Sequence, residues 1–430
     1  MMLKQKQCQY GGMTFCQPQR AQALKTSNFF CAFGCLEELI LPIRVLFRVF
    51  EFFLYLCKVK KKLLFEISII RPLIIFLLVV YHSLCVFTGG WAVPQGVSPN
   101  AAYWWMGHLI SGFRIETIAF VGGYVFCYQC FELGKRKGFF GFLWKKFKRL
   151  IIPCFVFGIV YYLLFRFNPN KFNWQVAFWR VANGIEHLWF LPMLFWCFLV
   201  CWLIDRLLQW LHARHGAWFM PVGWFLLAGL AAVSLLRVSG LKLGLSRVPY
   251  FLFYFYLGYW LRILLKRNAK EDGSAGSPLL FMVLWVLYFL FLMLHLQATH
   301  LILPGFSFQC PHWLRGCSQL TLHLFAFAHT ASGILALYFT VSYWLRRYRE
   351  PDSQPGPFLR QCSRLCYGVY VFHMFFMKPF YYNTPFPAWC AACRVGEWLM
   401  PWVVLSVTLG LSILVTWLLL KTSFGRFLIG

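Results

Sequence analysis

The chain has 430 residues, of which 60% are hydrophobic and only 13% are charged. Soluble proteins carry about 25% charged residues, so this composition excludes a soluble globular protein and predicts a polytopic membrane protein. The formal net charge of +28 does not predict nucleic-acid binding, because the basic residues stand in short clusters between apolar runs. That distribution follows the positive-inside rule and makes anionic membrane lipid the expected partner.

Residues 1–62 precede the first predicted span and are interpreted as an N-terminal cytoplasmic extension. Within the extension, residues 39–58 are apolar except for a polar stripe at spacings of three and four. This pattern predicts an amphipathic helix that lies in the membrane interface. No signal peptide is evident. The alternative that translation starts nearer Met13, with part of the extension dispensable, stays open.

Residues 63–425 are predicted to form one membrane domain of ten transmembrane helices, so the expected fold is an all-α polytopic membrane protein. Basic residues are concentrated in alternate connections, which predicts that both termini lie in the cytoplasm. The predicted spans are 67–88, 113–133, 149–166, 187–205, 218–236, 248–265, 278–297, 321–345, 364–382 and 398–420.

The first span carries a cation and an imidazole on one helical face. Eleven residues separate Arg71 from His82, which corresponds to roughly 16 Å along a helix and to three turns plus roughly 20° around it. Ionisable groups at membrane depth are costly and usually face a protein interior or a wet cavity, so both residues are functional candidates. The structural alternative is an arginine anchored at the interface and a buried histidine without a chemical role.

Glu116 begins the second span, in the sequence RIETIAFVGGYVF, at a depth similar to that of His82. We expect Glu116 to orient His82, which would act as a general base on a substrate hydroxyl. The alternative is that Glu116 pairs with Arg114 at the interface. Further along the same span, Gly122 and Gly123 predict close approach of a neighbouring helix or of a ligand.

A basic cluster in the sequence LWKKFKRLIIP leads into the third span and includes Lys145, Lys148 and Arg149. Such a cluster suits a ligand that carries several phosphates, although anchoring of the topology also explains it. Neither a Walker A motif nor a dinucleotide fingerprint occurs, so ATP hydrolysis is not expected. Cysteine and histidine spacings do not match a zinc site, so no metal is expected.

Two later segments hold polar groups at predicted span ends. Glu186, His187 and Trp189 stand at the mouth of the fourth span, in the sequence EHLWFLP. They suit a sugar, with Trp189 as a flat platform and the polar groups on hydroxyls, whereas the alternative is an aromatic belt residue beside a helix cap. His373, in YGVYVFHMFF, is another intramembrane imidazole that either faces the same substrate or is structural.

Taken together, these segments resemble the acyltransferase-3 family of bacterial integral-membrane acyltransferases. The matching features are Arg71 and His82 at the family's spacing, AFVGGYVF at 119–126, KKFKRLIIP at 145–153, HLWFLPMLF at 187–195 and YGVYVFH at 367–373. They occur in the family's order and extend over about residues 63–425. Gly122 and Cys366 stand where the family's motifs have serine.

The resemblance implies an enzyme of the bacterial inner membrane that moves an acyl group, acetyl above all, from cytoplasmic acyl-CoA to a hydroxyl of an extracytoplasmic glycan. By this analogy, Arg71 and the basic cluster hold the CoA phosphates, and His82 is a general base or carries the acyl group covalently. Acyl-CoA is then the donor, and no metal is implied. The rival function is a multi-span transporter or flippase of a glycan or lipid-linked substrate, against which the prolines near span ends argue. The acyl group, the acceptor and the oligomeric state are left open.

Overall fold

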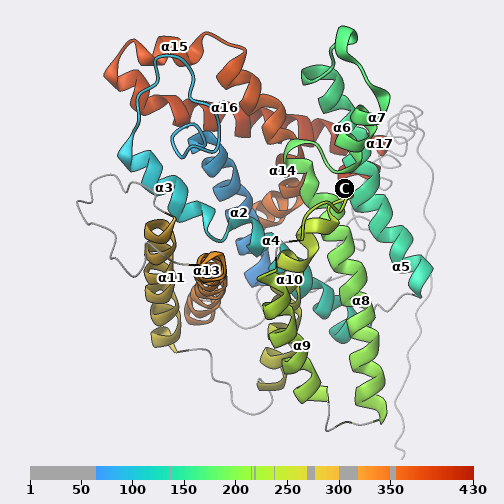
Figure 1. Cartoon of the computed structure of the whole chain (residues 1–430). Coiled ribbons are helices and arrows are strands. Elements are labelled where there is room, and N and C mark those ends of the chain that lie inside the picture. The colour runs from blue at the N-terminus through green and yellow to red at the C-terminus, as the bar shows by residue number, and fades with distance from the viewer. Residues whose placement is uncertain are drawn as a thin grey trace, which may run out of the picture. The chain divides into compact units, whose positions relative to one another are not determined.

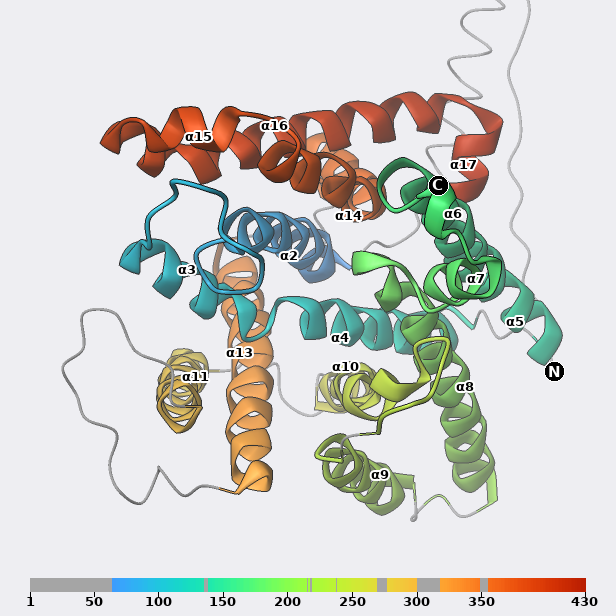
Figure 2. The same cartoon turned by 45° about the horizontal axis from the view of Figure 1, so that its top comes forward.

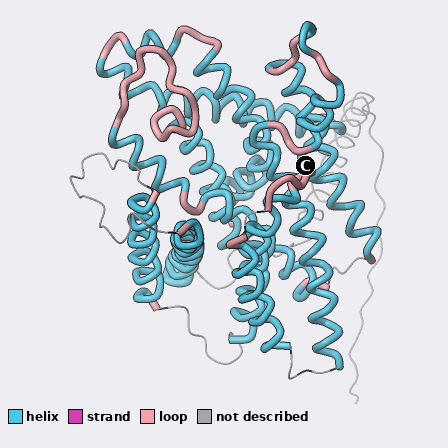
Figure 3. Tube along the Cα trace, viewed as in Figure 1, coloured by secondary structure: helices cyan, strands magenta, loops and turns pink. Residues whose placement is uncertain are grey.

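The computed structural model describes residues 64–134, 138–214, 216, 219–236, 238–268, 277–299, 318–348 and 355–430 (Figure 1). Every regular element in these ranges is a helix, and none of them is a strand (Figure 3). The predicted all-α fold is therefore confirmed. The predicted interfacial helix at 39–58 lies outside the described residues, as does the rest of the extension.

A helix stands at each of the ten predicted positions. Among the described residues, eight segments are long and apolar enough to cross a membrane, and α9 is a shorter apolar helix. The tenth, α14, is long but more polar, because it carries Arg360, Arg364, His373 and Lys378. The main helices are α2 (Phe65–Leu84), α3 (Ala101–Ser111), α4 (Arg114–Cys127), α5 (Phe139–Lys146), α6 (Ile152–Phe165), α7 (Trp174–Ala182), α8 (Phe190–Arg214), α9 (Phe219–Ser234), α10 (Val248–Asn268), α11 (Pro278–Ala298), α13 (Gln319–Tyr348), α14 (Pro357–Tyr382), α15 (Phe386–Ala391), α16 (Arg394–Lys421) and α17 (Ser423–Ile429). Two π-helical turns, η1 (Tyr128–Glu132) and η2 (Phe147–Ile151), and three 3-10 turns, η3 (Pro169–Lys171), η4 (Glu186–Trp189) and η6 (Leu245–Arg247), join them.

Helix α2 lies between α14 and α16 on one side and α4 and α13 on the other (Figure 2). Ile70 and Ile74 belong to an apolar core that α2 shares with α4, α10, α11 and α13. Leu78 and Val79 belong to a larger core that it shares with α8, α14 and α16. Because α2 is covered on both faces, the polar side chains that it carries are held inside the bundle.

Glycines allow α4 and α10 to cross closely. A Cβ atom at Gly123 would overlap the carbonyl oxygen of Phe255, and one at Gly258 would overlap that of Phe120. At Gly122 a Cβ would lie 3.1 Å from the Phe255 ring. The expected close approach of a neighbouring helix at these glycines is therefore confirmed, and that helix is α10.

We expect Gly123→Ala to destabilise the folded protein, because the new methyl group meets backbone that cannot rotate away. Overpacking of this kind costs about 1–3 kcal/mol. Gly410→Ala in α16 is the matched control, since nothing lies within 4 Å of its Cβ position. Thermal unfolding in detergent should show a lower midpoint for Gly123→Ala alone, and equal midpoints for both variants would contradict the close crossing.

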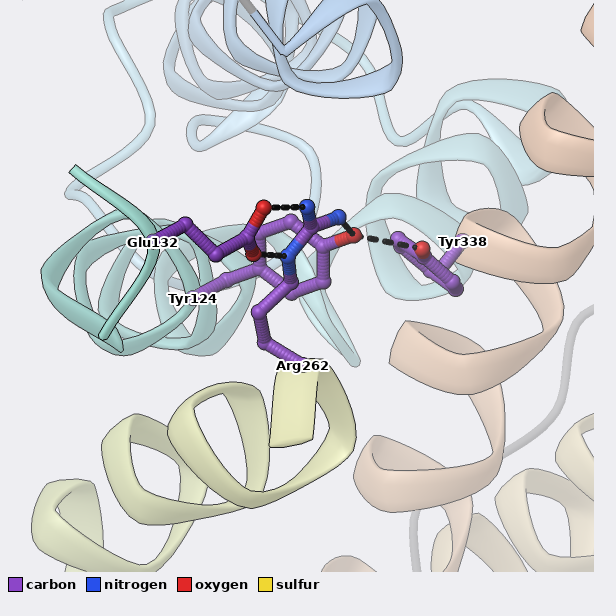
Figure 4. A network of polar contacts seen from close by, with 4 residues as sticks. All are labelled: Tyr124, Glu132, Arg262 and Tyr338. Carbon is purple, nitrogen blue, oxygen red and sulfur yellow. Dashed lines mark hydrogen bonds and ion pairs between the residues drawn. The ribbon is translucent and has the colours of Figure 1, made fainter. Parts of the chain in front are cut away.

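A polar network fixes α10 against α4 and α13, at the end of α4 away from Glu116 (Figure 4). Arg262 forks onto Glu132, with Nε 2.5 Å from Oε1 and Nη2 2.8 Å from Oε2. Its Nη1 donates to the Tyr124 hydroxyl at 2.9 Å, and that hydroxyl lies 2.8 Å from the hydroxyl of Tyr338. Bidentate pairs of this kind combine strength with a fixed geometry. The network therefore holds the three helices in register.

Candidate active site

Three histidines from separate segments meet inside the bundle: His82 in α2, His373 in α14 and His187 in η4. The imidazole centroids of His82 and His373 are 5.0 Å apart, and those of His187 and His373 are 4.8 Å apart. His373 is 0% exposed and His187 is 7% exposed, whereas His82 keeps part of its surface accessible. The structure thus gathers two of the predicted substrate-binding residues around the predicted base.

The hydrogen bonds of this cluster determine which nitrogen of His82 carries the proton. His373 Nδ1 lies 2.7 Å from the carbonyl oxygen of Tyr370, so it donates there and leaves Nε2 of His373 as an acceptor. That Nε2 is 3.3 Å from Nδ1 of His82, which is also 2.9 Å from the carbonyl oxygen of Leu78. Because both neighbours of His82 Nδ1 are acceptors, Nδ1 holds the proton and Nε2 keeps its lone pair. This is the tautomer that a base acting through Nε2 needs.

His187 supports the cluster from the opposite side. Its Nε2 lies 2.9 Å from the carbonyl oxygen of Val371, to which it donates, and its Nδ1 is buried without a hydrogen-bond partner. The hydroxyl of Tyr370 donates to the backbone carbonyl of His187 at 2.5 Å. His187 is therefore bound to α14 through both its side chain and its backbone, and it is placed as a neighbour of His373.

In the segment YGVYVFH of α14, four residues each contact a different neighbouring element. Tyr367 donates to the carbonyl oxygen of Arg149 at 3.0 Å, and Tyr370 reaches η4. A Cβ atom at Gly368 would overlap Thr416 of α16, so this glycine permits close packing. His373 reaches His82. The whole segment thus assembles the site from α2, η2, η4 and α16.

Two prolines free backbone carbonyls through which α14 binds the N-terminal part of α2 and the turn η2. Pro72 has no N–H to donate to the carbonyl of Ser68, four residues earlier, and Pro153 has none for the carbonyl of Arg149. Both carbonyls accept from α14 instead: Ser363 donates to Ser68 at 3.1 Å, and Tyr367 donates to Arg149. Through these two hydrogen bonds, α14 holds the start of α2 and the turn η2 together.

This arrangement brings two predicted phosphate-binding residues into one neighbourhood. Arg71 lies close enough to Arg149 and to the Cys366 thiol for electrostatic interaction. Arg149 is exposed and stands on the π-helical turn η2, a local geometry that is frequent at functional sites. Lys145 is exposed on α5, and Lys148 lies with its ammonium 5.5 Å from the ring centroid of Trp144. Of the basic cluster, Arg149 thus has an electrostatic interaction with Arg71.

The structure does not bring Glu116 into hydrogen-bond contact with His82. Glu116 faces α10, where Oε1 accepts from the Tyr250 hydroxyl at 3.4 Å, and Oε2 is buried without a partner. The expected orienting role is taken by Leu78 and His373. The alternative ion pair with Arg114 is not among those formed by the described residues.

Glu186 and Trp189 are engaged by cations. The Glu186 carboxylate pairs with Lys378 at 2.6 Å and with Arg166, and its backbone has φ = +52°, which is strained for a residue other than glycine. The guanidinium carbon of Arg247 lies 3.8 Å from the ring centroid of Trp189. The carboxylate predicted for sugar hydroxyls is thus already held by two side chains.

Two further residues near His82, Trp91 and Arg114, were not among the predicted site residues. Trp91, in the loop after α2, stacks on the His82 imidazole with ring centroids 5.9 Å apart and planes 22° apart. Arg114 lies over the ring of Tyr81, with the guanidinium carbon 3.4 Å from the ring centroid. Neither Trp91 nor Arg114 lies at a helical spacing from His82. The one sequence clue is that Tyr81, the ring that Arg114 covers, directly precedes His82.

Comparison with protein families finds that residues 64–421 match the acyltransferase domain of the acyltransferase-3 type. This range contains every candidate residue described above and nearly all of the described helices. The chain matches no curated protein and no solved structure.

Proposed function

Since the chain belongs to the acyltransferase-3 family and is therefore a membrane acyltransferase, we propose that it transfers an acyl group, acetyl in the simplest case, from cytoplasmic acyl-CoA to a hydroxyl of an extracytoplasmic glycan. The proposed location is the bacterial inner membrane. The observation that carries the proposal is the pair of groups on α2, with a base of defined tautomer at one end and an arginine beside Arg149 at the other.

The Arg71 end suits the donor. CoA carries several phosphates, and arginine binds phosphate through planar, bidentate hydrogen bonds. The Arg71 and Arg149 guanidinium groups interact electrostatically, and Lys145 and Lys148 add positive charge along the same segment. From there, the roughly 16 Å of helix between Arg71 and His82 matches the reach of an extended pantetheine arm, which would bring the thioester to the imidazole.

The His82 end suits the chemistry. Nε2 of His82 accepts the proton of an acceptor hydroxyl, the oxygen attacks the thioester carbon, and the proton passes to the departing CoA thiolate. Leu78 and His373 keep Nδ1 protonated throughout, so the ring does not turn to the other tautomer. A covalent acyl-imidazole at Nε2 is the second route that the same geometry supports.

The acceptor belongs on the Trp91 side of His82. Trp91 is flanked by Tyr381 and Tyr382, whose ring centroids lie 6.2 and 6.5 Å from that of Trp91. The Lys378 ammonium lies 5.4 Å from the ring centroid of Trp91. Aromatic faces next to charged groups suit a sugar ring and its hydroxyls. Trp189, with Glu186 and His187 beside it, is proposed to line the same entrance.

The purified protein in detergent, incubated with radiolabelled acetyl-CoA, tests this function. We expect release of free CoA above the uncatalysed rate, and label retained on the protein if the covalent route operates. Monodisperse, folded protein that neither binds acetyl-CoA nor releases CoA would contradict the proposal and would favour a transporter.

His373 is proposed to position His82 rather than to touch the substrate. We expect His373→Phe to lower kcat by about 10-fold or more, because His82 then loses one of the two acceptors that hold its Nδ1 proton. His373→Gln keeps an acceptor and should lose less. The pH profile of kcat separates the roles: the apparent pKa of the base should shift in the Phe variant, and an unchanged profile would mean that His373 only packs.

A further inference from the structure

Arg114 is a half-buried cation with two buried donors that no group in the described part of the chain accepts. It is the first residue of α4, and its Nε and Nη1 atoms are buried without a hydrogen-bond partner. The guanidinium carbon lies 3.4 Å from the ring centroid of Tyr81, which is a favourable cation–π contact but does not satisfy the Nε and Nη1 donors. The position thus has an aromatic support and an unfilled set of donors.

Protein carboxylates do not neutralise this charge directly. Glu116 lies close enough for electrostatic interaction with Arg114, but the two form no ion pair within the part of the chain that the structure describes. Burial of a charge without a hydrogen-bonded partner is destabilising, and ionisable groups kept at membrane depth are commonly functional. Arg114 therefore has the properties of a residue that binds a negatively charged group of a ligand or reaction intermediate.

The location of Arg114 identifies where that negative charge would arise. Arg114 interacts electrostatically with both His82 and His373. Tyr81, on which it lies, is the sequence neighbour of His82, and the two rings are 5.4 Å apart between centroids. Arg114 is thus linked to His82 through Tyr81 and through its electrostatic interaction with the imidazole.

We propose that Arg114 is a catalytic residue that stabilises the oxyanion of the transfer step. This inference rests on the proposed function. As the acceptor hydroxyl gives its proton to Nε2 of His82, its oxygen bonds to the thioester carbon, and the carbonyl electron pair moves onto the carbonyl oxygen. Arg114 donates hydrogen bonds to that negative oxygen. The pair then returns to reform the carbonyl, the carbon–sulfur bond breaks, and the CoA thiolate takes the proton from His82.

Arg114→Met tests this role, with Arg206→Met as the control. Arg206 also lies over an indole, with its guanidinium carbon 4.9 Å from the ring centroid of Trp202, but it is exposed on α8. Loss of one oxyanion donor typically lowers kcat by about 10²–10³-fold. We expect that loss in Arg114→Met, with KM for acetyl-CoA changed by less than about threefold and Arg206→Met unaffected. Arg114→Lys should recover part of the rate.

Thermal unfolding separates catalysis from structure. Because Nε and Nη1 of Arg114 are buried without a hydrogen-bond partner, its removal should leave the unfolding midpoint unchanged or raise it. If Arg114→Met does not fold, Arg114→Gln carries the same test with a neutral polar side chain. A wild-type kcat in a folded neutral variant, or a fall in kcat that only accompanies a lower midpoint, would overturn the role of Arg114. Absence of CoA release by wild-type protein would overturn the proposed function itself, and this role with it.

Discussion

Replacement of His82 by alanine is expected to lower kcat for acetyl-CoA-dependent transfer by about 10²–10⁴-fold, the usual contribution of a positioned general base. The physical reason is that Nε2 is the one atom of the histidine cluster that combines a free lone pair with access from outside. His373 commits Nδ1 to the Tyr370 carbonyl and lies fully buried, and His187 is buried. Neither of them can replace His82 as the base.

His212→Ala is the matched control for this prediction. His212 is exposed near the end of α8, where its ring packs against Phe219. It should keep the wild-type rate. Folded His82→Ala with full transfer would refute the central role of His82, whereas label on the wild-type protein that disappears in His82→Ala would add the covalent route to the mechanism.

Arg71→Met is expected to raise KM for acetyl-CoA by about 10- to 100-fold, because hydrogen bonds to charged groups are worth about 1.5–3 kcal/mol. The effect should depend on the donor. S-acetylpantetheine lacks the nucleotide and its phosphates, so wild type and Arg71→Met should use it equally poorly. Steady-state kinetics with both donors measures this difference.

Arg360→Met controls for a general loss of positive charge, since Arg360 is an exposed arginine in the first turns of α14. It should leave both KM values unchanged. An equal penalty for Arg71→Met with both donors would contradict phosphate binding and would place Arg71 in a structural role.

The fold was largely readable from the sequence, because runs of apolar residues long enough to cross a membrane leave few alternatives to a helix. The shared helical face of Arg71 and His82 was equally accessible, since both residues lie on one helix and its geometry sets their relation. The site beyond α2 was not. The contact between His82 and His373 joins residues 291 positions apart, and no periodicity reports it.

Glu116 shows why proximity in depth is a weak guide. A carboxylate at the right level of the membrane can face either neighbour of its helix, and here α4 turns Glu116 toward Tyr250 of α10. The acceptor for His82 Nδ1 is instead a backbone carbonyl one turn earlier together with a second imidazole. Neither has a sequence signature, because every residue has a carbonyl and most buried histidines are structural.

The prolines show the same limit in another form. From the sequence, Pro72 and Pro153 stand near span ends, which argues only against a transporter. In the structure, Pro72 lies inside α2, and each proline leaves a carbonyl that α14 binds through a hydroxyl. Their effect on the site therefore depends on hydrogen bonds between residues 295 and 218 positions apart, which pattern analysis along one segment cannot supply.

The central claim is that the two ends of one helix face divide the work, with Arg71 binding the donor and His82 performing the chemistry. Equilibrium binding of radiolabelled acetyl-CoA to purified wild type, His82→Ala and Arg71→Met measures this division directly. We predict a wild-type Kd for His82→Ala and a Kd raised at least about 10-fold for Arg71→Met. Loss of binding in His82→Ala, or wild-type binding in Arg71→Met, with each protein shown to be folded, would contradict it.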